Sequence, residues 1–146
     1  MEKQKLIIII ADYSNSPGPR YCYQGDDSGE DFYHKVLNNK FKIALESKKN
    51  LEINLDGPDG YASSFLDEAF GNLVFDFGLD NIKEYIKVIS TEEPEWIDML
   101  ENETYLQWEQ RRKNNQVPKK TIEHEAWWKY NFTNNSIEKD VWIAKS

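Results

Sequence analysis

The stretch at residues 51–71, LEINLDGPDGYASSFLDEAFG, limits the possible folds of this chain more than any other segment. Its first five residues alternate apolar and polar side chains, which is the period of a β-strand. A turn rich in glycine and proline follows, and from Ser64 onward apolar residues recur at helical spacing. A strand that passes through a tight turn into a helix is typical of α/β domains, so we expect a sheet with helices packed on it.

Other segments show the same two periods and the turn residues that separate them. The apolar run at 6–11 is β-branched and continuous, as in a buried strand, and Gly78 is a natural helix stop. We expect strands at 6–11, 20–24, 51–55 and 85–89, helices at 28–46, 64–77 and 91–112, and a C-terminal hairpin that turns at 131–136.

Length and composition predict one folded domain outside a membrane. A chain of 146 residues fits a single core, and its 39% apolar and 14% aromatic residues argue against disorder. The apolar run at 6–11 is too short for a signal peptide or a membrane span, so we expect a cytoplasmic protein. The single cysteine, Cys22, has no partner for an internal disulfide, and we interpret it as a packing residue.

The negative charge is concentrated in one predicted helix. Residues 92–109 contain seven acids and no base, which leaves −1 of the net charge of −8 for the rest of the chain. So acidic a chain is a poor direct binder of nucleic acid, because phosphate contacts need lysine and arginine. The alternative function is a phage-type acidic inhibitor or decoy of a nucleic-acid-binding protein. Its acidic face would consist of Glu95, Asp98, Glu101, Glu103 and Glu109.

Four phrases of the sequence resemble one known family. They are GPRY at 18–21, SGEDF at 28–32, KFKIALESKKNLEINLDG at 40–57 and GYASSFLDEAFG at 60–71. Together they resemble a STAS-like bacterial and phage family of uncharacterised function, over about residues 6–108. The resemblance implies an α/β fold with a STAS-like mixed β-sheet and helices packed on it. It divides the chain into a STAS-like domain at 1–116 and a C-terminal aromatic extension at 117–146 packed on the same domain.

STAS domains, including the anti-sigma-factor antagonists, place a serine between the third strand and the second helix. The resemblance implies that a GHKL-type ATPase or kinase phosphorylates this serine and that the unmodified form binds the partner. Ser64 matches that serine, whereas Ala62 and Phe65 replace the acid and the glycine of the usual motif. We therefore hypothesise a non-enzymatic regulatory module that binds a protein partner. The expected binding residues are Ser63, Ser64, Asp56, Asp59, Tyr61, Phe65 and Asp67.

The same segment allows three other interpretations. Ser64 and Asp67 have the spacing of a capping box, in which each side chain bonds the other's backbone N–H. The start of this helix is also suited to a small anion or a nucleotide. Asp56 and Asp59, with the acids at 26–27, offer oxygen ligands for Mg²⁺, although aspartate and glycine are also what tight turns require. We expect turn chemistry here, with no metal and no cofactor.

Two further sets of residues are candidates for function. His34 and His124 are the only histidines, and neither belongs to a recognisable catalytic signature, so we expect surface or edge positions and no enzyme. The tail carries many large rings that need to be covered. We expect them to pack on the domain, with a partner or dimer interface as the alternative; they are Trp127, Trp128, Tyr130, Phe132 and Trp142.

Overall fold

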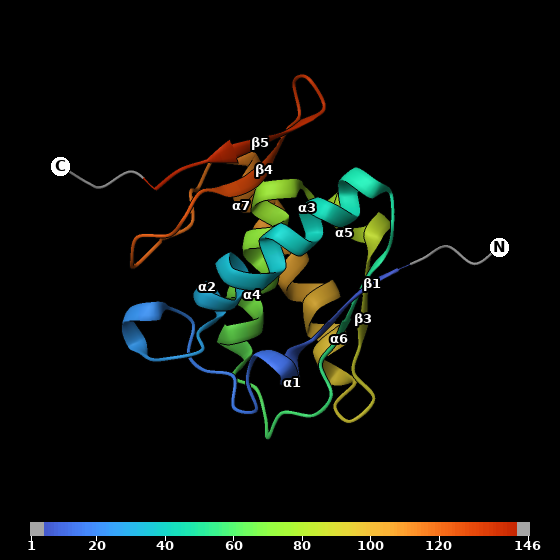
Figure 1. Cartoon of the computed structure of the whole chain (residues 1–146), viewed down its shortest axis with the longest axis vertical. Helices are drawn as coiled ribbons and strands as arrows, with labels where there is room; N and C mark the ends of the chain where they lie inside the picture. Colours follow the sequence, from blue (N-terminus) through green and yellow to red (C-terminus); the bar gives the residue numbers. More distant parts are fainter. Residues whose placement is uncertain (1–4, 143–146) are drawn as a thin grey trace.

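The computed structural model describes residues 5–142 and contains two separate sheets (Figure 1). Three parallel strands, β1 (Leu6–Ile9), β2 (Leu51–Asn54) and β3 (Ile86–Ile89), pair in the order β1-β2-β3. The register places Ile8 beside Ile53 and Ile53 beside Val88. Ile8 and Ile53 are buried while Ile7 is exposed, so the sheet buries one of its faces.

Helices occupy most of the remaining chain. The helical elements are α1 (Ile10–Tyr13), η1 (Cys22–Gln24), α2 (Gly29–Phe32), η2 (Tyr33–Leu37), α3 (Asn38–Ser47), α4 (Ser63–Phe77), α5 (Leu79–Tyr85), α6 (Glu95–Met99), η3 (Leu100–Thr104) and α7 (Tyr105–Lys113). Helices α2 and α3 are joined without a break by the π-helical turn η2, and α6 and α7 are joined in the same way by η3.

Helix α4 is the centre of the fold. It contacts α2, η2, α5, η3, α7 and the C-terminal hairpin, and Figure 1 shows it between α2 and α7. Gly71 permits the closest of these approaches, because a Cβ there would lie 2.1 Å from the ring of Trp108. Gly78 ends the helix with a φ of 85°, a value that favours glycine. Since α4 is covered on nearly every side, it provides a rigid base for whatever its first residues do.

The C-terminal hairpin is tied to the helical layer rather than to the parallel sheet. It consists of β4 (Trp127–Asn131) and β5 (Ser136–Asp140), which pair antiparallel and lie near α3 and α4 in Figure 1. Asn38 holds it in place, because its side chain accepts a hydrogen bond from the Trp128 N–H and donates one to the Trp128 carbonyl, both at 2.8 Å. Trp127 is only 7% exposed. The dimer or partner interface proposed for this tail stays a prediction.

The expected α/β class, the strands at 6–11, 51–55 and 85–89, the long helices and the terminal hairpin are confirmed, and the three strands pair in parallel. Antiparallel pairing is confined to the hairpin. The predicted strand at 20–24 is wrong: Gln24 accepts a hydrogen bond from the Tyr21 N–H through its side chain, and its own N–H bonds the Tyr21 carbonyl. These local bonds form the short helix η1 and leave no ladder for a neighbouring strand. Helix α5 was not predicted, and β1 ends at Ile9, where α1 begins.

The division into residues 1–116 and 117–146 stays a prediction, and residues 143–146 of the expected extension lie outside the described residues. In the described part of the chain, every helix is too short or too polar to cross a membrane.

A buried polar cluster lies between the helices. The Tyr33 hydroxyl donates a hydrogen bond of 2.5 Å to the Asp76 carboxylate, and it accepts one of 2.9 Å from Asn38. Burial raises the pKa of Asp76 to about 6. Because this lies above the roughly 3.9 of an unfolded aspartate, the protonated carboxyl stabilises the fold below about pH 4, and this contribution is lost as the pH rises through 6.

We expect an Asp76→Asn variant to lose this pH dependence. Between about pH 4 and pH 6.5, its free energy of unfolding should fall by about 2–3 kcal/mol less than that of the wild type. Urea unfolding followed by circular dichroism at a series of pH values measures the difference. Asp80→Asn, at an exposed position in α5, is the control and should keep the wild-type slope. Parallel curves for wild type and Asp76→Asn would contradict the assignment.

Candidate functional site

The two serines singled out by the sequence form the first turn of α4. Ser63 is exposed and Ser64 is partly buried, and within residues 5–142 neither hydroxyl has a hydrogen-bond partner. The expected capping box is wrong, because Ala62 is the N-cap and no side chain caps this helix. With the helix starting at Ser63, the Ser64 side chain is already inside the first turn. The Asp67 carboxylate is used elsewhere.

Arg20 connects the GPRY phrase to α4. Its Nη1 donates to the Asp67 carboxylate at 2.7 Å and to the Glu68 carboxylate at 3.1 Å. Glu68 is deeply buried, with 2% of its side chain exposed, and Asn72 donates to its second oxygen at 2.8 Å. Burial raises the pKa of Glu68, although Asn72 and Arg20 oppose that shift. Arg20 is therefore the cation that bonds this carboxylate directly, with Lys120 also favouring its charged form, and it fixes the loop at 18–21 beside the first turns of α4.

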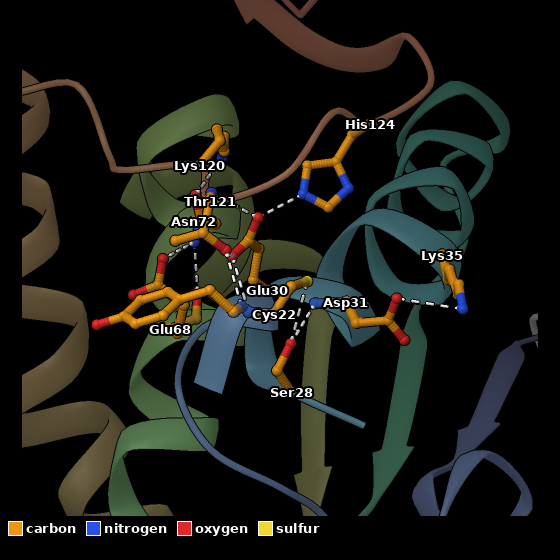
Figure 2. Close-up of polar contacts among 11 residues, drawn as sticks. Cys22, Ser28, Glu30, Asp31, Lys35, Glu68, Asn72, Lys120, Thr121 and His124 are labelled. Carbon is orange, nitrogen blue, oxygen red and sulfur yellow. Dashed lines mark hydrogen bonds and ion pairs between the residues drawn. The ribbon is translucent and has the colours of Figure 1, made fainter. Parts of the chain in front are cut away.

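Glu30, in the SGEDF phrase, connects α2 to two distant segments, the short helix η1 and the chain before β4 (Figure 2). One carboxylate oxygen accepts from the Cys22 N–H at 3.0 Å and the Thr121 hydroxyl at 2.5 Å. The other accepts from the Thr121 N–H at 2.9 Å and meets His124 Nε2 at 2.6 Å. Burial alone would favour the neutral form, but the hydrogen bonds from His124 and Thr121 prevail and lower the pKa of Glu30 to about 2.

The contacts of Glu30 correct the prediction that both histidines lie at surface or edge positions. His124 is 7% exposed in its side chain and bonds Glu30, and His34 stacks on it with 3.8 Å between ring centroids. Burial lowers the pKa of His34 to about 2, so this ring stays neutral. Because Glu30 and His124 are 94 residues apart in the chain, no local pattern could have paired them.

A groove of about 360 Å³ runs from the start of α4 to η3 and α7. Ser63, Asp67 and Arg20 line one side of it. The opposite side presents two charged residues of opposite sign, Glu103 and Arg111, among others. Two residues of the predicted binding surface, Ser63 and Asp67, thus face the predicted acidic helix across a shared groove.

Comparison with known families gives a match for part of this arrangement. Residues 28–96 match the model of a STAS-like domain of unknown function (DUF4325). This segment is a STAS-like domain. No curated protein and no solved structure matches the chain. The matched region of the STAS-like domain contains Glu30 and both serines, whereas Arg20 precedes it and the Thr121–His124 segment follows it.

The other expected binding residues of the STAS-like domain mainly support its loops. Asp56 accepts hydrogen bonds from the N–H groups of Thr91 and Glu92, which lower its pKa and fix the turn after β3. The Tyr61 hydroxyl donates to the Leu55 carbonyl at 2.6 Å. Phe65 is fully buried in the core. Asp59 accepts a long hydrogen bond from the Ser16 hydroxyl at 3.4 Å. Their role in partner binding stays a prediction.

The predicted acidic face divides into exposed residues without an ion pair and one residue that is engaged. Glu109 is partly buried, and it accepts a hydrogen bond of 2.6 Å from Arg112. The other four are exposed, and within residues 5–142 none of them forms an ion pair; they are Glu95, Asp98, Glu101 and Glu103.

Proposed function

We propose that this chain is a non-enzymatic regulatory module that binds a protein partner through the start of α4 and the adjoining groove. The observation that carries the proposal is the pair of unbonded hydroxyls, Ser63 and Ser64, at the first turn of α4, a helix in which most residues are buried. The presence of a STAS-like domain supports a regulatory role of the kind found in anti-sigma-factor antagonists.

The local chemistry fits recognition by a partner. The first N–H groups of a helix lack intrahelical acceptors and carry a positive partial charge, so a carboxylate or phosphate of a partner is stabilised there. The groove beside Ser63 offers Arg20 and Arg111 as donors, with Asp67 and Glu103 as acceptors. A phosphate on Ser64 would add about −1.5 to −2 of charge next to Asp67 and Glu68, which would weaken binding of an acidic partner segment.

Ser64 is the proposed control point, with Ser63 as its neighbour, and the family resemblance names a GHKL-type ATPase or kinase as the candidate partner. We expect the tagged wild type to recover this partner from its native cell, identified by mass spectrometry. Ser64→Asp should weaken the affinity of the purified pair at least tenfold, and Ser64→Ala should not. The matched control is Ser47→Asp, at the exposed end of α3. Equal affinity in all four proteins would remove the switch.

The acidic decoy remains the second candidate because four exposed carboxylates lack a cationic partner among residues 5–142. The same binding assay separates the two functions. A partner that is retained by Ser64→Asp but released by high salt, and by the combined glutamine and asparagine substitutions at 95, 98, 101 and 103, would favour the decoy.

A further inference from the structure

Three side chains with the donor atoms of a metal site meet above α2. Cys22 comes from η1, Glu30 from the first turn of α2, and His124 from the segment before β4. Their ligand atoms all lie within 4.8 Å of one another. Figure 2 shows the three side chains converging from separate parts of the chain. A thiol, a carboxylate and an imidazole on three separate segments cannot be detected by sequence spacing.

Each donor is already oriented by its neighbours. The Ser28 hydroxyl accepts from the Asp31 N–H at 3.0 Å, which directs its proton to Cys22 Sγ at 3.3 Å. The sulfur is therefore placed as an acceptor, as a metal-bound thiolate would be. The Glu30 carboxylate is fixed by Thr121 and by the Cys22 N–H, and one of its oxygens lies 2.6 Å from His124 Nε2. Fixed second contacts of this kind orient metal ligands in proteins.

We propose that Cys22 Sγ, a Glu30 carboxylate oxygen and His124 Nε2 bind one thiophilic divalent cation of the Zn²⁺ class, with water as the fourth ligand. Tetrahedral zinc takes sulfur at about 2.3 Å and nitrogen or oxygen at about 2.0–2.2 Å, which places its ligand atoms roughly 3.3–3.8 Å apart. Atoms already within 4.8 Å reach this geometry by side-chain rotation. Sulfur and imidazole ligands select Zn²⁺ over Mg²⁺ or Ca²⁺.

Binding requires a defined exchange of protons. Burial raises the pKa of Cys22 to about 11, so the thiol keeps its proton until a cation displaces it. The Cys22 thiol releases its proton to solvent, and the His124 ring binds the cation as the neutral tautomer that carries its N–H on Nδ1 and leaves Nε2 free. The charge of the three ligands then becomes −2, from the thiolate and the carboxylate, and it balances the divalent ion.

His34 lies against the site but is not one of its ligands. Its ring is within 11° of parallel to that of His124, at 3.8 Å. An ion in the plane of the His124 ring lies outside the plane of His34, where the His34 nitrogens have no lone pair to offer. Both His34 nitrogens are buried without a hydrogen-bond partner in the described chain, so this ring serves as a wall that keeps water away. It is a matched control for His124.

The experiment uses the full chain stripped with EDTA and then titrated with Co²⁺ and Zn²⁺. Because Cys22 is the single cysteine, a thiolate-to-cobalt charge-transfer band reports on this site alone. We expect one equivalent of Co²⁺ to produce the band, Zn²⁺ to remove it, and Zn²⁺ to raise the melting temperature where Mg²⁺ does not. Cys22→Ser should abolish the band, and His124→Gln should weaken binding by about 10–100-fold.

The control separates ligation from packing. His34→Gln should retain the cobalt band and the zinc-dependent rise in melting temperature. Absence of the band in the wild type, or zinc binding that Cys22→Ser leaves unchanged, would overturn the site. A loss in His34→Gln equal to that in His124→Gln would overturn the ligand assignment. Should His124→Gln fail to fold, Cys22→Ser decides the question, because Cys22 lies in the short, partly exposed turn η1.

Discussion

Replacing Trp108 with alanine is expected to lower the free energy of unfolding by about 3–5 kcal/mol. The side chain is 1% exposed and packs directly on Gly71 of α4, which has no side chain of its own to fill the space that alanine would leave. Its indole N–H also donates to Asp67 at 3.2 Å. The variant therefore loses apolar burial, leaves a cavity between α4 and α7, and removes one donor from a carboxylate at the candidate site.

Urea unfolding followed by far-ultraviolet circular dichroism measures this loss without depending on tryptophan fluorescence. Leu106→Ala is the control, because this residue lies on the same helix but is 54% exposed. It should change the free energy of unfolding by less than about 0.5 kcal/mol. A loss below about 1 kcal/mol in Trp108→Ala would show that α7 does not pack on α4 as described.

Replacing Arg20 with methionine is expected to cost about 3–5 kcal/mol at neutral pH. The substitution keeps an apolar stem but removes the cation from Glu68, whose side chain is 2% exposed. An unpaired carboxylate in the core takes up a proton more readily, so the folded-state pKa of Glu68 rises further above its unfolded value. The stability that Arg20→Met loses at neutral pH should therefore be regained in part as the pH falls and Glu68 becomes neutral.

Two variants test this explanation for Arg20. Arg111→Met changes an arginine of the same groove that lies over the Trp108 ring and forms no ion pair within residues 5–142, so a loss of about 1 kcal/mol or less is expected. The double variant Arg20→Met with Glu68→Gln should recover most of the stability, because residue 68 then carries no charge that Arg20 has to offset. If the double variant is as unstable as Arg20→Met alone, the loss comes from packing rather than from the carboxylate.

Local patterns were sufficient wherever the relevant contacts are short in sequence. The alternation of Leu51, Ile53 and Leu55 predicted β2 because one face of the sheet is buried. The apolar spacing after Ser64 and the stop at Gly78 predicted α4 to within one residue. The pattern could not show that α4 is surrounded on nearly every side, nor that Gly71 serves as the contact for a tryptophan 37 residues later.

The candidate site was predicted in part. The sequence placed both serines at a helix start beside a turn, and they are there. It assigned Asp67 to a capping box, whereas Asp67 accepts from Arg20, which lies 47 residues earlier. It did not show that Cys22, His34 and His124 lie together. The short helix η1 and the turn before β4 have no hydrophobic period from which their neighbours could be predicted.

The amino-acid sequence by itself determined the secondary structure of the core and the position of the two serines. Both depend on hydrophobic periodicity and on glycine and proline, which act over a few residues. Only the tertiary structure decided which polar groups share the interior: Arg20 with Glu68, and Glu30 with Thr121 and His124. Buried polar groups require partners, and those partners are selected by the way α2, α4 and the C-terminal segment pack together, over separations of 48 to 94 residues.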